Sequence, residues 1–170
     1  MRKAWSAVLV AALAALPLLG AQEKPQEPKP KESRTAYLRR IFEKDRAGFG
    51  DACRAVLSLV KDEHSDADFE AVRKDLESRG IVDGGWELGE SSPLDRGTLA
   101  YMLCKALGIK GGLTMGVFGT TRRYALRECV HLGLIPGGTT GQYLSGRELI
   151  DVLGNVEAWR ESGSTDSLRK

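Results

Sequence analysis

Two stretches of the chain repeat the same order of residue types, and this repetition constrains the fold more than any other feature. The first stretch, SRGIVDGGWELGESSPLDRGTLAYML, runs from Ser78 to Leu103, and the second, HLGLIPGGTTGQYLSGRELIDVL, runs from His131 to Leu153. Each contains a glycine, an apolar pair, a glycine pair, a loop and then a leucine. A short unit cannot bury its own apolar face, so such units are expected to stack around a shared core.

Apolar residues outside these connectors recur at every third or fourth position, which is the spacing of one face of a helix. Six segments show this pattern, and no segment shows a convincing alternating strand. The six stripes begin at Tyr37, Cys53, Phe69, Leu99, Ala125 and Leu149. We therefore predict an all-α domain of about six short helices, arranged as repeated helix–loop–helix units, two of them clear and one degenerate.

The connectors of the two clear units carry glycines at matching places. Gly80 and Gly133 each follow a predicted helix, where a left-handed glycine ends the helix with little strain. The apolar pair after each glycine is expected to turn the chain back into the core. The glycine pairs at 84–85 and 137–138 would then permit a sharp turn.

The second helix of each clear unit begins with residues that suit a helix N-terminus. Ser145 and Glu148 form the capping-box pattern, in which each side chain accepts a hydrogen bond from the backbone N–H of the other residue. Asp95 and Thr98 form a weaker version of the same pattern. The degenerate unit lacks the full connector, and its second helix is expected to open at residues 48–51.

The chain begins with the three parts of a secretory signal peptide, which are a positive head, an uncharged apolar stretch and a small-residue exit. We expect residues 1–21 to be removed, with an uncleaved anchor helix as the alternative and the chain's only route to a membrane. The Pro/Lys/Glu-rich residues 22–33 predict a disordered spacer, and residues 161–170 a disordered tail. The folded domain would span residues 34–160 of a protein exported to the periplasm, the cell envelope or the extracellular space.

The charge balance bears on the class of partner. The full chain has 25 basic and 23 acidic residues, and removing Arg2 and Lys3 with the signal peptide leaves 25 − 2 = 23 basic against 23 acidic residues. Nucleic-acid binding depends on an excess of lysine and arginine. We therefore expect no nucleic-acid partner.

The chain has three cysteines, Cys53, Cys104 and Cys129. Two of them could pair as a disulfide in an exported protein, but each lies on an apolar helix stripe, so we expect small buried hydrophobic side chains. Their spacing, and that of His131, does not fit a metal site. No motif pairs a nucleophile with a base. We therefore expect no metal, no cofactor and no catalysis, with an unrecognised hydrolase as the alternative.

The repeated unit resembles the S-layer homology module. The resemblance lies in the order of a helix, a Gly-Ile connector, an aromatic residue, a proline and a tetrad that opens the second helix, and it covers residues 47–156. The family tetrad Thr-Arg-Ala-Glu corresponds to Asp-Arg-Gly-Thr at 95–98 and to Ser-Gly-Arg-Glu at 145–148. The aromatic and proline of the family loop correspond to Trp86 and Pro93.

The resemblance implies attachment to cell-wall polysaccharide, because such modules, commonly in threes, tether exported proteins there. In the family, the tetrad arginine helps to line the groove that holds an anionic sugar. Only the first clear unit has arginine in that slot, as Arg96, whereas the second has Gly146, with Arg147 one place on, and the degenerate unit has Phe49. The family's fold pattern is therefore better kept than its binding pattern.

The residues around Arg96 suggest a sugar site of their own. Arg96 and Asp95 would supply charge and Trp86 an indole face for stacking, with Arg147 as a further binding residue. Alternatively, Asp95 only caps a helix, Arg96 is solvated and Trp86 packs on the core. Separately, the pair Arg122–Arg123 with the glycine-rich segment 108–121 could form an anion-binding turn, although we favour a flexible hinge.

These observations predict an exported, non-catalytic protein that attaches to or organises envelope glycan. Its partner would be a cell-wall or envelope polysaccharide, or an envelope protein. The alternative is a protein-interaction or structural domain that has kept the scaffold and lost glycan binding.

Overall fold

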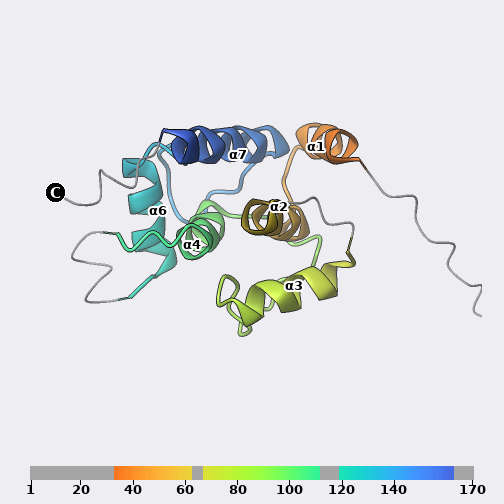
Figure 1. Ribbon diagram of the computed structural model, residues 1–170, viewed down its shortest axis with the longest axis horizontal. Helices are drawn as coiled ribbons and strands as arrows, with labels where there is room; N and C mark the ends of the chain where they lie inside the picture. Colours follow the sequence, from red (N-terminus) through yellow and green to blue (C-terminus); the bar gives the residue numbers. More distant parts are fainter. Residues whose placement is uncertain (1–32, 63–66, 112–118, 163–170) are drawn as a thin grey trace, which may run out of the picture. The chain divides into compact units, whose positions relative to one another are not determined.

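The regular elements of the computed structural model are all helices within the residues that it describes, which are 33–62, 67–111 and 119–162. This confirms the prediction of an all-α domain with six helices in those ranges. The predicted signal peptide, nearly all of the spacer and most of the predicted tail lie outside them. In chain order the helices are α1 (Arg34–Phe42), α2 (Phe49–Lys61), α3 (Phe69–Ser78), α4 (Arg96–Ala106), α6 (Arg122–His131) and α7 (Gly146–Glu161) (Figure 1).

The main packed helix pairs are offset from the units that the sequence repeats. The first unit contains α1 and α2, the second α3 and α4, and the third α6 and α7. The structure packs α3 on α2 and α6 on α4, so the first helix of a unit lies on the second helix of the unit before it. The pairing of α1 with α7 closes this order into a cycle, with the two ends of the described chain side by side (Figure 1).

A closed ring of three backbone hydrogen bonds joins the three units. The N–H of Ala47 donates to the carbonyl of Leu144 (2.9 Å), the N–H of Leu144 to that of Leu94 (3.0 Å), and the N–H of Leu94 to that of Ala47 (2.9 Å). Each of the three residues is buried and lies immediately before the N-cap of α2, α4 or α7. The ring therefore fixes the starts of these three helices relative to one another.

The first backbone N–H of each of these helices is also satisfied by a neighbouring segment. An α-helix leaves its first N–H groups without an intrahelical acceptor, and such groups are costly when buried. Here each one donates to a carbonyl in the segment that precedes another helix of the set. The pairs are Phe49 with Ser92 (2.8 Å), Arg96 with Gln142 (2.9 Å) and Gly146 with Lys44 (2.9 Å).

The connectors behave as their repeated glycines predict. Gly80 and Gly133 have φ angles of 67° and 72°, in the left-handed region that ends a helix at low cost for glycine. The apolar pairs 81–82 and 134–135 are buried and turn the chain back into the core, as expected. That core is a single cluster with buried residues from all six described helices.

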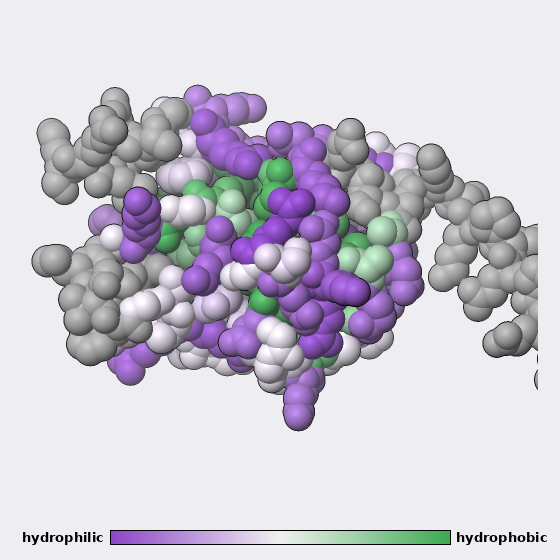
Figure 2. Space-filling view, turned by 60° about the horizontal axis from the view of Figure 1, so that its bottom comes forward, coloured by the Kyte–Doolittle hydropathy of each residue, from purple (hydrophilic) through white to green (hydrophobic). Residues whose placement is uncertain are grey.

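The surface of the described residues is largely hydrophilic on the side that faces the viewer in Figure 2. On the side shown in Figure 2, hydrophilic residues predominate and hydrophobic ones show through in small separate patches. The large apolar side chains that are exposed in the described ranges are Phe42, Val130 and Tyr143. No helix in those ranges is both long and apolar enough to cross a lipid bilayer.

The start of α7 provides a test of the close contact between the first and third units. A Cβ at Gly146 would lie 1.7 Å from the carbonyl oxygen of Ile41 and 3.1 Å from that of Lys44, and both are backbone atoms. We expect Gly146→Ala to lower the free energy of unfolding by at least about 2 kcal/mol, because the backbone must move to admit the methyl group. Urea denaturation followed by circular dichroism measures this change.

The matched control is Gly154→Ala in the same helix, where an added Cβ meets no atom within 4 Å. Alanine favours a helix interior over glycine, so this variant should gain about 0.5–1 kcal/mol. A Gly146→Ala protein as stable as the Gly154→Ala protein would contradict the described contact between α7 and the segment after α1.

Candidate functional site

Arg96, the arginine of the predicted sugar site, is the first residue of α4 and is only 4% exposed. Its Nη2 donates to Oε1 of Glu148 in α7 at 2.7 Å. Its Nη1 donates to the carbonyl oxygens of Pro136, at 2.9 Å, and of Gly137. The guanidinium is thus enclosed by the loop before α7 and is not solvated, which corrects the alternative drawn from the sequence.

The glycine pair of the third unit also leaves room for a close side-chain contact. A Cβ at Gly138 would lie 2.7 Å from Nη1 of Arg96 and 2.5 Å from Oε1 of Gln142. Neither Gly137 nor Gly138 is among the described residues with positive φ. The absence of a side chain at 138 therefore admits the guanidinium of Arg96 close to the loop.

Glu148, the ion-pair partner of Arg96, also forms the predicted capping box with Ser145. Its Oε2 accepts from the backbone N–H of Ser145 at 2.9 Å, and its own N–H donates to Oγ of Ser145 at 3.2 Å. The Ser145 backbone N–H, more than any other group, lowers the pKa of Glu148, and the guanidinium of Arg96 lowers it further. The carboxylate consequently stays ionised, caps α7 and pairs with α4.

Trp86 and Asp95 meet through a third side chain, Arg122 at the first position of α6. The guanidinium of Arg122 lies 4.5 Å from the centre of the Trp86 ring, and its Nη1 lies 3.9 Å from Oδ2 of Asp95. Asp95 also caps α4 as predicted, since its Oδ1 accepts from the N–H of Thr98 at 2.7 Å. The rings of Phe49 and Tyr101 also pack edge-on against the half-buried Trp86. The indole is therefore packed within the protein.

Arg147, the remaining predicted binding residue, contacts a different part of the molecule. Its side chain is exposed and its guanidinium lies 4.7 Å from the centre of the Phe42 ring at the end of α1. The structure therefore brings Trp86 and Asp95 together, seals Arg96 beneath a loop, and places Arg147 against α1.

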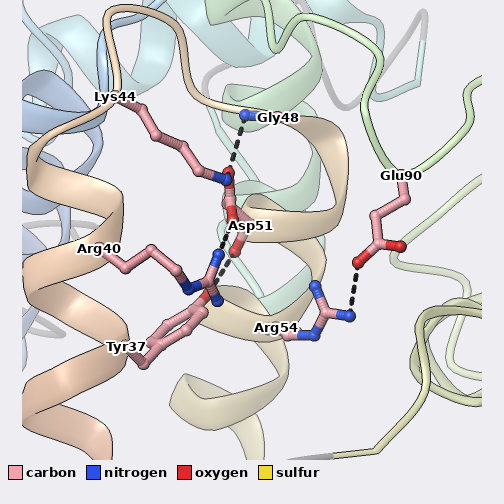
Figure 3. A network of polar contacts seen from close by, with 7 residues as sticks. All are labelled: Tyr37, Arg40, Lys44, Gly48, Asp51, Arg54 and Glu90. Atoms are coloured by element: carbon pink, nitrogen blue, oxygen red, sulfur yellow. Dashed lines mark hydrogen bonds and ion pairs between the residues drawn. The ribbon is translucent and has the colours of Figure 1, made fainter.

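Sequence reasoning did not anticipate the polar cluster around Asp51, the third residue of α2 (Figure 3). The Asp51 carboxylate is buried, and its Oδ2 accepts from Nζ of Lys44 at 2.6 Å and from the N–H of Gly48 at 3.0 Å. A guanidinium nitrogen of Arg40 lies 3.8 Å from Oδ1, and the Tyr37 hydroxyl donates to the Asp51 carbonyl at 2.8 Å. Because groups of the chain itself occupy the positions around the Asp51 carboxylate, the cluster ties α1 to α2.

A separate ion pair in the same view links the first and second units. Nη2 of Arg54, in α2, lies 2.6 Å from Oε1 of Glu90 in the loop before α4 (Figure 3). The glutamate is half exposed, so this pair contributes little to stability on its own. Its effect is to hold one edge of that loop against α2.

An open cleft of about 540 Å³ lies between α6 and the loop at residues 137–140. Arg123 and Arg127 line it from α6, one helical turn apart, and both are exposed. Neither guanidinium has an ion-pair or hydrogen-bond partner within the part of the chain that the structure describes. Leu126 and Val130 add apolar surface from the same helix.

The cleft suits an anionic ligand with some apolar surface. Two unpaired guanidinium groups on one side can bind carboxylate or phosphate oxygens in a bidentate manner. The facing loop lines the cleft with Gly137, Gly138, Thr139 and Thr140. The sequence pointed to Arg123 but not to Arg127, although the four-residue spacing of the two on a predicted helix is a signal that they share a face.

Metal binding and catalysis by a thiol have little support in the described ranges. No three His, Cys, Asp or Glu side chains there lie close enough to hold a metal ion. All three cysteines are buried, as predicted, and burial raises the pKa of Cys53 to about 12, so that thiol stays protonated at neutral pH. Comparison of the chain with protein-family models, with curated proteins and with solved structures gave no match.

The contacts of Arg96 predict a structural role. We expect Arg96→Ala to lower the free energy of unfolding by about 2–3 kcal/mol, because it leaves Glu148 and two loop carbonyls without a buried partner. Arg147→Ala, at the next position of the equivalent helix start, should change it by no more than about 0.5–1 kcal/mol. Urea denaturation of both variants measures the difference. Equal stabilities would show that the Arg96 contacts contribute nothing.

The lowered pKa of Glu148 predicts a dependence of stability on pH. A carboxyl whose folded pKa lies below its usual value of 4.5 stabilises the fold above that value and ceases to do so as pH falls through the folded pKa. We expect the urea midpoint of the parent protein to fall more steeply on acidification below 4.5 than that of Glu148→Gln, so that the two curves converge. Glu161→Gln, at the exposed end of α7, controls for net charge and should run parallel to the parent.

Proposed function

We propose that this chain is an exported, non-catalytic protein of the cell envelope that binds an anionic glycan in the cleft between α6 and residues 137–140. Its three helical units, joined in a cycle, are consistent with the resemblance to the S-layer homology module. The observation that carries the proposal is the pair Arg123 and Arg127, unpartnered within the described ranges and facing an open cleft.

The chemistry of the cleft favours an acidic sugar over a small inorganic anion. Guanidinium groups recognise the carboxylate of a sugar acid through paired, charge-assisted hydrogen bonds. The exposed side chain of Val130 can cover part of the C–H face of a pyranose ring, and Thr139 and Thr140 carry hydroxyls that can bond to those of the sugar. An inorganic anion would leave the apolar side chain of Val130 without a contact.

Arg96 supports this site without touching the ligand. Its contacts with the carbonyls of Pro136 and Gly137 hold the loop that forms the second wall of the cleft. The site that we propose therefore differs from the one expected from the sequence. Arg96, in the tetrad slot, positions one wall of the cleft, and Arg123 and Arg127 of α6 bind the ligand.

The second candidate function is a protein-interaction or structural domain that has lost glycan binding. The observation in its favour is that the arginine in the family's binding slot is sealed within the protein. Under this alternative the cleft arginines are solvated and bind no sugar. An envelope protein would then be the partner.

The binding test compares an acidic polysaccharide with a neutral one. We expect the full chain to bind polygalacturonate, and polysaccharide purified from the cell envelope, but not dextran, in affinity electrophoresis. Replacing both arginines, as Arg123→Gln with Arg127→Gln, should weaken binding at least about tenfold, because two charge-assisted contacts are lost.

The control removes the same charge elsewhere. Arg39→Gln with Arg160→Gln takes two exposed arginines from α1 and α7, outside the cleft. This double variant should bind as the parent does. Equal weakening by both double variants would reduce the interaction to net charge. Failure of the parent to bind either acidic polysaccharide would overturn the proposal in favour of the second candidate.

A further inference from the structure

Two cysteines that are 25 residues apart in the chain meet in the core between α4 and α6. The Sγ atoms of Cys104 and Cys129 are 3.7 Å apart, and both residues are buried. The third cysteine, Cys53, is buried separately in α2. The structure therefore singles out one of the three pairings that the sequence leaves open.

The surroundings of the two sulfurs are reciprocal. Sγ of Cys104 lies 3.8 Å from the carbonyl oxygen of Ala125, one turn before Cys129, and Sγ of Cys129 lies 3.7 Å from that of Ala100, one turn before Cys104. Each sulfur thus rests on the backbone of the opposite helix. The small, fully buried alanines let the two backbones come this close.

We propose that Cys104 and Cys129 form a disulfide that joins α4 to α6. A disulfide requires an S–S distance near 2.05 Å, so the two sulfurs must approach further by rotation of the side chains about their Cα–Cβ bonds. The bond belongs to an oxidising compartment, in agreement with the export expected from the sequence.

The reaction is a thiol–disulfide exchange with a disulfide oxidant, either an oxidoreductase or a small molecule such as oxidised glutathione. One cysteine thiolate attacks a sulfur of the oxidant to give a mixed disulfide and release one thiol. The other cysteine thiolate then attacks the mixed disulfide, forms the Cys104–Cys129 bond and releases the second thiol. Two protons and two electrons pass from the protein to the oxidant.

The burial of the two cysteines determines when this reaction can occur. Contact with Cys104 and desolvation both raise the pKa of Cys129, so its thiolate does not form while the two helices are packed. Oxidation therefore belongs to the folding chain, or to moments when α6 separates from α4. Once formed, the bond is shielded from reductants in solution.

The consequence is a covalent link between α6, which forms one wall of the cleft, and α4, whose Arg96 holds the loop that forms the other wall. Arg96 of α4 holds the loop at residues 136–138, and α6 carries Arg123 and Arg127. The disulfide fixes α6 on α4 independently of the chain between them. It does not depend on what the cleft binds, so it stands or falls separately from the glycan proposal.

The test refolds the full chain from urea in a buffer of reduced and oxidised glutathione. We expect the purified protein to be about 2 Da lighter than the reduced chain, with one reactive thiol in denaturant, at Cys53, and a proteolytic peptide linking Cys104 to Cys129. The urea midpoint should rise relative to the reduced protein and return to its value when a strong reductant is added during unfolding.

Variants identify the pair without relying on stability alone. Cys53→Ala should still show the loss of about 2 Da, whereas Cys104→Ala and Cys129→Ala should not. Mass measurement of the parent protein remains decisive even where a variant fails to fold. Three reactive thiols after refolding in oxidised buffer, or a linked peptide that contains Cys53, would overturn the proposal.

Discussion

The ring of backbone hydrogen bonds among Ala47, Leu94 and Leu144 is the constraint on which the rest of the structure depends. Each residue donates one bond and accepts one, so removing any member leaves a buried N–H and a buried carbonyl unpaired. Both losses are costly away from water. Because the three residues come from three different units, the ring makes the units interdependent. It also explains the packing of α1 on α7, since the third unit must return to the first to complete it.

The helices that begin next to the hydrogen-bond ring have different side-chain ion pairs at their starts. At the start of α7, Glu148 caps the helix and pairs with Arg96 from α4. At the start of α2, Asp51 takes the equivalent third position, and its cation, Lys44, comes from the preceding segment of the same unit. The backbone arrangement is thus repeated three times, while the ion pairs are particular to each junction. Such differences give every junction its own partner and disfavour an exchange of units.

The sequence predicted the all-α fold, the helix-ending Gly80 and Gly133 and the capping box of Ser145 with Glu148, because these depend on neighbouring residues. It did not predict the offset pairing of helices or the ring, which depend on contacts between residues far apart in the chain. The burial of Arg96 could not be predicted from the sequence for the same reason. Its partners lie 40 to 52 residues away, and nothing local distinguishes a guanidinium that enters a loop from one that meets solvent.

The open cleft is a less costly place for an anionic ligand than the surroundings of Arg96. A ligand at Arg96 would have to displace Glu148 and two loop carbonyls, each of which would lose a buried partner before the ligand gained one. Arg123 and Arg127 carry no such cost, because within the described ranges neither has an ion-pair or hydrogen-bond partner to lose. In a fold whose junctions are closed by internal ion pairs, a ligand could reach arginines outside the junctions without breaking such a pair. The exposed turn of α6 beside residues 137–140 meets that condition, and the ring and Arg96 together keep the facing loop in place.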